Sequence, residues 1–189
     1  VTNPSTNFQL FQTGETDYDA FTSRPDDIEQ LRMLGFANIN LYGSSDYSQV
    51  EFNVRRPALK DVKVRQALIY GLDRQKLIDV VYQGYGKVAV EPIAPISWAY
   101  NPQGVNPYHY DPAQAKKLLD EAGWKPGPDG IRVKDGQRLE LTLLVSKKVL
   151  NDALIPIAKE NWQQIGVVLK PQVVDFNALM AQRKAGNYD

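Results

Sequence analysis

Apolar residues recur at helical spacing over much of the chain. The clearest case is residues 111–123, where Asp111 can cap a helix that begins at Pro112, and Gly123 follows the last apolar position. A stripe of alanine and leucine occupies one face of this helix. The same spacing predicts helices over residues 25–34, 61–71, 73–84 and 152–165, and a final helix capped by Asp175.

Prolines constrain two of these helices. Pro25 suits the first turn of its helix, so that Ser23 or Arg24 would precede it. Pro156 has no N–H to donate, and we expect it to lie in the first turn of the helix over residues 152–165. The apolar residues of that helix should face inward; they are Leu154, Ile157, Ala158, Trp162 and Ile165.

Other segments alternate between apolar and polar residues, as strands do. Residues 37–42 and 49–54 are predicted to be strands on either side of a polar turn. Residues 131–133 and 139–145 flank the turn dipeptide Asp135-Gly136, which predicts a hairpin. Residues 167–174 form a further strand, near an edge or a bulge because Pro171 cannot donate to a ladder.

Prolines at 92, 95, 102 and 107 make residues 91–110 an irregular segment, which we expect to be an ordered loop rich in aromatic residues. Helices and strands alternate through the rest of the chain without repeats or low-complexity tracts. The expected fold is therefore α/β, with helices packed on a mixed β-sheet and residues 1–189 forming a single domain.

Composition narrows the possible functions. Lys plus Arg and Asp plus Glu are balanced at 22 each, which argues against nucleic acid as a partner. The chain has no Cys and one His, so thiolate chemistry, Cys-ligated zinc, iron–sulfur clusters and multi-His metal sites are excluded. No stretch has the length of a membrane-spanning helix, and the first residues have neither the basic nor the apolar region of a signal peptide, so neither element is expected in these 189 residues. The start at Val1 and the end at Asp189 suggest a piece cut from a longer protein.

A set of motifs in a fixed order covers nearly the whole chain. They are GETDYD (residues 14–19), VEFNVRRPALKDVKVRQALIYGLDRQKLI (50–78), YDPAQAKKLLDEAGW (110–124) and DFNALMAQRKAGNYD (175–189). With these motifs the chain resembles the extracellular solute-binding proteins of the peptide, dipeptide and nickel ABC-importer family. The resemblance implies a type II periplasmic-binding-protein fold with two lobes that close over a ligand, and this chain as the C-terminal ligand-binding lobe.

The resemblance also implies a function. The chain is expected to capture oligopeptides or dipeptides at the periplasm or cell surface and to deliver them to ABC permease subunits. No cofactor is implied, and contact with the membrane would come only through a lipid anchor or the permease. The acidic residue with which the family pairs a peptide's amino group would lie beyond Asp189. Alternatives are a receptor of the same fold for a nickel chelate or an oligosaccharide, a ligand sensor, and, remotely, an enzyme that acts on peptides.

Lys147, Lys148 and Asn151 lie between a predicted strand and a helix N-terminus, where backbone amides and cations favour an anion. The family has ligand contacts in the corresponding loop, so these residues are predicted to contact a peptide carboxylate; a merely solvated loop is the alternative. Phe176 and Arg183 share a face of the last helix and, at family positions, would supply an aromatic wall and a carboxylate-binding arginine. Otherwise Phe176 is in the core and Arg183 forms a surface ion pair.

Aromatic residues of the 91–110 loop are further candidates. Trp98 and Tyr100, with Tyr108 and Tyr110, could line a pocket for ligand side chains or could pack the loop onto the core. Trp124 and Trp162 are expected to be in the core. No nucleophile motif, phosphate-binding loop or metal-ligand set accompanies His109, so the sequence predicts a protein without catalytic or metal-binding residues.

Overall fold

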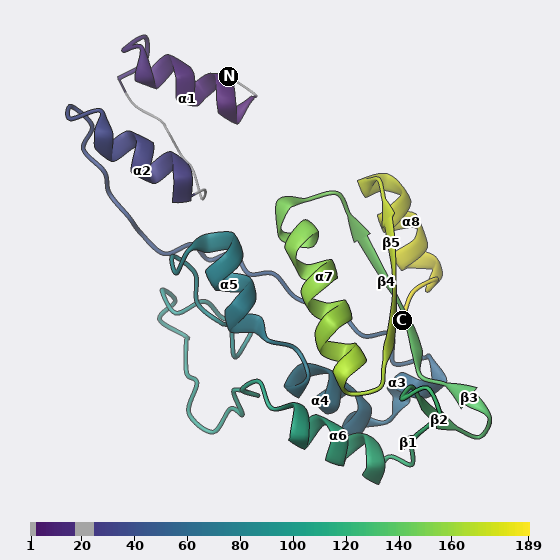
Figure 1. The fold of residues 1–189 in the computed structure, drawn as a ribbon. Helices are drawn as coiled ribbons and strands as arrows, with labels where there is room; N and C mark the ends of the chain where they lie inside the picture. The colour runs from purple at the N-terminus through teal and green to yellow at the C-terminus, as the bar shows by residue number, and fades with distance from the viewer. Residues whose placement is uncertain (1–2, 18–24) are drawn as a thin grey trace.

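The computed structural model describes residues 3–17 and 25–189 (Figure 1). Ser23, Arg24 and the last residues of the GETDYD motif, Tyr18 and Asp19, therefore lie outside the described residues. In chain order the helices are α1 (Pro4–Gln12), α2 (Pro25–Met33), α3 (Pro57–Lys60), α4 (Val62–Tyr70), α5 (Arg74–Tyr82), α6 (Pro112–Glu121), α7 (Val149–Gln164) and α8 (Phe176–Ala185). The strands are β1 (Lys125–Pro126), β2 (Arg132–Lys134), β3 (Gln137–Arg138), β4 (Glu140–Ser146) and β5 (Val168–Val174).

The strands form two small sheets. In the first, β1, β2 and β3 pair in order and antiparallel, and Asp135 and Gly136 turn the chain with positive φ angles of 50° and 75°. In the second, β4 and β5 run parallel, with Glu140 opposite Val168 and Ser146 opposite Val174. Helix α7 connects these two strands, so they form a β–α–β unit, and α8 lies on the other side of the pair from α7 (Figure 1).

The α/β class is confirmed, and so are the predicted caps of α5, α6 and α8. The side chains of Asp73, Asp111 and Asp175 each accept a hydrogen bond from a backbone N–H of the helix that follows, at 2.9 Å in every case. Pro25 and Pro112 begin their helices, as expected. Helix α1 was not predicted, although Asn3 caps it by accepting from the N–H groups of Ser5 and Thr6.

Three expectations about the elements were wrong. Residues 37–42 and 49–54 are not strands: the backbone there belongs to neither sheet, and an alternating pattern cannot form a ladder without a partner strand. Strand β2 pairs with β1 and with the short strand β3, while the alternating run after Leu139, expected to complete the hairpin, pairs in parallel with β5. Pro156 lies inside α7 and not in its first turn, because the helix begins earlier than expected, at Val149. Proline has no N–H to donate to the carbonyl four residues before it, which is that of Asp152. Asp152 is exposed, so water can take the place of this donor.

The core lies where α4, α6 and α7 meet the parallel strands. Leu59, Leu68, Leu119, Leu139 and Ile165 are almost wholly buried, and Trp124 and Trp162 are buried with them, as predicted. The indole N–H of Trp162 donates to the backbone oxygen of Leu68 at 2.9 Å, which joins α7 to α4. No described residue of α1 or α2 belongs to this core cluster. Helix α2 is joined to the end of α5 by a hydrogen bond from the side chain of Gln83 to the carboxylate of Asp26 at 3.1 Å.

The Trp162 hydrogen bond gives a testable prediction. Trp162→Phe removes the donor and leaves both a buried carbonyl without its partner and a small void, so the free energy of unfolding should fall by about 1–3 kcal/mol. Trp98→Phe is the matched control: Trp98 is 99% exposed, and its change should stay within about 0.5 kcal/mol. Urea unfolding monitored by circular dichroism measures both values, and equal effects would contradict the assignment.

Candidate functional site

A shallow hollow of about 440 Å³ lies between α8 and the segment that precedes α3. Its walls are formed by Glu51, Arg55, Met180, Arg183, Lys184 and Tyr188. Three of these side chains are cationic and one is a carboxylate, so the hollow carries an excess of positive charge. An anion, or the carboxylate end of a larger ligand, fits this electrostatic character.

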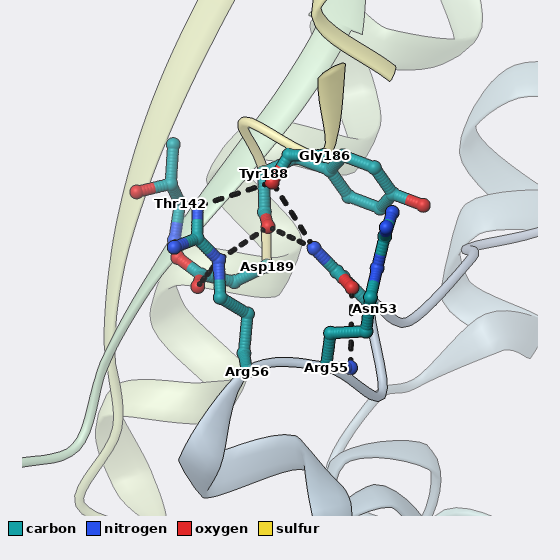
Figure 2. Close-up of polar contacts among 7 residues, drawn as sticks. All are labelled: Asn53, Arg55, Arg56, Thr142, Gly186, Tyr188 and Asp189. Carbon is teal, nitrogen blue, oxygen red and sulfur yellow. Dashed lines mark hydrogen bonds and ion pairs between the residues drawn. The ribbon is translucent and has the colours of Figure 1, made fainter. Parts of the chain in front are cut away.

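Beneath the hollow, Asn53 fixes the two chain segments that form it (Figure 2). The side chain of Asn53 is buried, and its amide donates to the backbone oxygens of Gly186 at 3.2 Å and Tyr188 at 3.0 Å. Its backbone N–H donates to the backbone oxygen of Asp189 at 2.7 Å, and its side-chain oxygen accepts from the N–H of Arg55. One buried amide thus holds together segments that are far apart in the sequence.

Arg56 and Asp189 extend this network to β4. The Arg56 guanidinium donates to the backbone oxygen of Tyr188 at 2.9 Å and pairs with the Asp189 carboxylate at 3.3 Å. That carboxylate also accepts from the backbone N–H of Thr142 at 2.7 Å. We call the contacts of Asn53 and Arg56 with residues 186–189 the Asn53 network. It anchors the floor of the hollow to the β4–β5 sheet (Figure 2).

Arg183, a predicted ligand contact, lines the hollow and is already paired there. Its Nε and Nη2 atoms donate to Oε2 of Glu51 at 3.1 and 2.6 Å, and the hydroxyl of Tyr188 donates to Oε1 of the same carboxylate at 3.3 Å. Both side chains of the ion pair are about half exposed. The structure therefore shows the alternative that Arg183 forms a surface ion pair, and this pair is part of the wall of the hollow.

Phe176 begins α8 and does not line the hollow; the apolar side chain of α8 in the wall is Met180. Phe176 is 61% exposed, so the alternative that it belongs to the core is wrong. The strands β4 and β5 are parallel, with Ser146 opposite Val174, so both end at the same side of the sheet. Phe176, which follows β5, therefore lies at the same end of these strands as the turn between β4 and α7. Phe176 and Arg183 thus lie toward opposite ends of one helix.

The turn between β4 and α7 carries the other predicted charges. Lys147 and Lys148 are exposed, and Lys148 is the N-cap residue of α7 without a side-chain capping bond. Asn151 lies within α7, and its amide donates to the backbone oxygen of Ser146 at 2.7 Å, which closes the turn. Asp152 in the first turn of the helix offsets part of the positive potential there.

The loop over residues 91–110 is ordered by polar contacts, as expected. The Arg74 guanidinium donates to the backbone oxygens of Pro107 and Tyr108 at 2.5 and 2.7 Å, and burial lowers the pKa of this guanidinium. Tyr108 packs edge-on against Tyr70, with ring centroids 5.0 Å apart. The hydroxyl of Tyr110 donates to the side chain of Gln164. These two tyrosines therefore pack the loop against neighbouring helices.

Trp98 and Tyr100 lie in the same loop and are not brought to the hollow. The loop, which joins α5 to α6, is on the opposite side of the molecule from α8 in Figure 1. Trp98 is almost fully exposed, while Tyr100 is half-buried and its backbone N–H donates to Ser97 in a turn. The structure thus separates the predicted contacts into the hollow, the β4–α7 turn and the aromatic loop.

Sequence reasoning missed most of the hollow. Glu51, Arg55, Lys184 and Tyr188 all lie in the motifs over residues 50–78 and 175–189 that carried the resemblance, but periodicity gives no sign that these motifs touch. Within the described ranges there is no group of three or more His, Cys, Asp or Glu residues placed to hold a metal ion. The described helices include none that is both long and apolar enough to cross a membrane.

Comparison with known proteins agrees with this architecture. The family model described as bacterial extracellular solute-binding proteins, family 5 Middle, matches residues 1–189. The oligopeptide-binding protein AppA of Bacillus subtilis is 32% identical over 98% of this chain and 35% of its own length. The dipeptide-binding protein of Escherichia coli is 29% identical over 87% of this chain and 29% of its own length.

Solved structures give the same result. AppA in complex with a nonapeptide superposes with a TM-score of 0.79 at 30% identity, over 96% of this chain and 36% of AppA. NikA from Brucella suis in complex with Fe(III)-EDTA has a TM-score of 0.78 at 28% identity, over all of this chain and 39% of NikA. The chain thus spans about a third of the length of these relatives. From the match over its whole length, the chain belongs to the family 5 bacterial extracellular solute-binding proteins.

Proposed function

We propose that this chain is a ligand-binding part of the substrate-binding component of an ABC importer, and that the complete protein captures peptides outside the cytoplasmic membrane. The observation that carries the proposal is the cationic hollow beside α8, in a chain whose whole length matches the solute-binding family. A peptide presents a carboxylate, which arginine binds with charge-assisted hydrogen bonds. The relatives AppA and the dipeptide-binding protein of Escherichia coli bear peptide-binding names.

The hollow is open and shallow, which suits one half of a cleft. Relatives are about three times as long, and we propose that a second lobe of the complete protein covers this surface when ligand is bound. Lys147 and Lys148 would then add positive potential at the β4–β5 edge, and Phe176, exposed at the same edge, would supply an apolar wall. Trp98 and Tyr100 remain predicted contacts for ligand side chains.

In this proposal the protein binds and releases its ligand without chemical change, and permease subunits receive the ligand. The described polar side chains of the hollow are three cations, a carboxylate paired with one of them, and a tyrosine whose hydroxyl donates to that carboxylate; they include no serine, cysteine or histidine. The protein needs no cofactor for such a role, and it works at the periplasm or the cell surface.

A metal chelate is a second candidate ligand. The solved structure of NikA contains Fe(III)-EDTA, and the carboxylates of such a chelate would also suit an excess of cationic side chains. The two candidates differ in shape: a peptide extends away from its carboxylate, whereas a chelate is compact. They can therefore be distinguished with defined probes.

Isothermal titration of the complete protein tests the proposal. We expect saturable binding, one ligand per protein, for at least one peptide in a series of unbranched peptides from a dipeptide to a nonapeptide, and no binding of Fe(III)-EDTA. Binding of Fe(III)-EDTA without any peptide would support the chelate receptor instead. If neither probe binds, the proposed ligand classes are wrong.

A further inference from the structure

We propose that Arg55, rather than Arg183, is the cation that binds the ligand's carboxylate in the hollow, and that Arg55 therefore determines the preference for ligands with a free carboxylate. This inference rests on the proposed function. The wall of the hollow contains three cations, Arg55, Arg183 and Lys184. They differ in whether they already have an acidic partner, and this decides which of them can bind a ligand carboxylate.

Arg183 already forms an ion pair with Glu51. It uses both Nε and Nη2 for Glu51, whose other oxygen accepts from Tyr188, so the carboxylate of Glu51 has charge-assisted partners at both oxygens. A ligand carboxylate approaching Arg183 would have to displace Glu51 or lie beside it, and like charges at that separation repel. Binding there would exchange one ion pair for another, with little net gain.

Arg55 is held in place but has no such partner. Its backbone N–H donates to the buried side chain of Asn53 at 3.2 Å, which places residue 55 on the rigid floor formed by the Asn53 network. Within the described part of the chain, its guanidinium makes no hydrogen bond or ion pair. In Figure 2 the side chain rises from this floor into the region of Gly186 and Tyr188. A carboxylate that binds Arg55 would gain charge-assisted hydrogen bonds without breaking one within the protein.

The backbone around Arg55 leaves room for its guanidinium. Gly186 ends α8 with a φ of 75°, and a Cβ at this position would lie 3.0 Å from Nη2 of Arg55 and 3.5 Å from its Cζ. Glycine is thus favoured at residue 186 both by its left-handed backbone and by the nearby guanidinium.

Lys184 is the remaining cation in the wall. It lies in the last turn of α8 and, like Arg55, makes no ion pair among the described residues. A lysine ammonium is a strongly hydrated point charge on a flexible stem, whereas a guanidinium presents a planar fork that matches both oxygens of a carboxylate. Lys184 would therefore add positive potential, and Arg55 would provide the directed contact.

The test compares two forms of one peptide on the complete protein: the shortest unbranched peptide that binds in the titration series, as its free acid and as its C-terminal amide. Isothermal titration is carried out on the wild type and on Arg55→Gln, Arg55→Lys and Arg183→Gln. Arg138→Gln is the matched control, because Arg138 is an exposed arginine paired with Asp129 and Glu140, away from the hollow. Thermal melting of each variant verifies that it folds.

We expect the wild type to bind the acid more tightly than the amide. Arg55→Gln should weaken binding of the acid by roughly tenfold to a hundredfold and leave the amide within about threefold, because one charge-assisted contact is lost. The affinity of Arg55→Lys for the acid should lie between those of the wild type and Arg55→Gln, since lysine keeps the charge but lacks the planar guanidinium. Arg183→Gln should change the ratio of acid to amide affinity less than Arg55→Gln does, and Arg138→Gln should not change it.

The inference is overturned if Arg55→Gln keeps the wild-type ratio while Arg183→Gln abolishes it. It is also overturned if the folded wild type binds acid and amide equally; the proposed peptide function would then stand without this contact. A wild type that binds no peptide in either form overturns the proposed function itself.

Discussion

Replacing Arg132 with methionine is expected to lower the free energy of unfolding of the 189-residue chain by about 3–5 kcal/mol, the largest single effect that we predict. The Arg132 side chain is only 4% exposed. It donates to the backbone oxygens of Ile165 at 2.8 Å, Trp124 at 2.6 Å and Lys116 at 3.2 Å, and to the carboxylate of Asp120 at 2.8 Å. One guanidinium thus joins β2 to α6, to the residue Trp124 that follows α6, and to the C-terminal end of α7.

Methionine fills a similar volume but offers no donor, so several carbonyl oxygens would lose their partners, and each buried carbonyl left unsatisfied costs about 1–3 kcal/mol. The hydrogen bond from Arg132 also holds the pKa of the Asp120 carboxyl below its usual range. Because a depressed pKa stabilises the folded state above the unfolded pKa, this contribution disappears as the pH falls through the folded pKa of Asp120. Asp120 is about half exposed, so this pH-dependent part is small.

Arg138→Met is the matched control for Arg132→Met. Arg138 also forms ion pairs, with Asp129 and Glu140, but its side chain is 44% exposed. The loss there should be much smaller than for Arg132→Met, because exposed ion pairs contribute little. Urea unfolding gives both values, with the slope of the transition as a check on cooperativity. Similar losses for the two arginines would show that burial of Arg132 does not have the assigned role.

Asn53→Ala is expected to lower the free energy of unfolding by about 2–3 kcal/mol. The substitution removes the amide that donates to Gly186 and Tyr188 and the oxygen that accepts from the N–H of Arg55. It should also speed hydrogen exchange at the backbone N–H groups of Asn53 and Thr142, whose acceptors are both on Asp189. The effect should therefore be local as well as global.

Asn40→Ala is the comparison, since Asn40 is an exposed asparagine outside the helices and sheets. Its effect on unfolding should remain within about 0.5 kcal/mol. Hydrogen exchange followed by mass spectrometry of peptic fragments separates the two variants. If the backbone N–H groups of residues 53 and 142 keep their protection in Asn53→Ala, the Asn53 network is not what fixes the floor of the hollow.

The sequence predicted those parts of the fold that depend on local chemistry. Helix starts at Asp73, Asp111 and Asp175 could be predicted because a capping carboxylate acts on an N–H group of the next turn. The strand segments over residues 37–42 and 49–54 were mispredicted because alternation reports only a suitable surface, and pairing depends on a partner elsewhere. The parallel pairing of β4 with β5 was not predicted for the same reason, because the pattern within each strand does not identify its partner. The intervening helix α7 makes this parallel pairing possible.

The hollow could be predicted only in part for a related reason. Arg183 was found through its position in a motif, and it does line the hollow. Glu51 and Arg55, which decide how Arg183 can act, approach it only because Asn53 joins segments separated by 133 residues. No periodicity or spacing signals such a contact. The physical cause is a long-range hydrogen-bond network, and it becomes visible only in three dimensions.

Native mass spectrometry of the complete protein, purified without denaturation, tests the central claim most directly. We expect a series of masses above that of the protein, which correspond to co-purified peptides, and their loss when the protein is denatured. A single retained mass that fragmentation identifies as a metal chelate or a sugar would contradict the peptide assignment, although it would leave the solute-binding family in place.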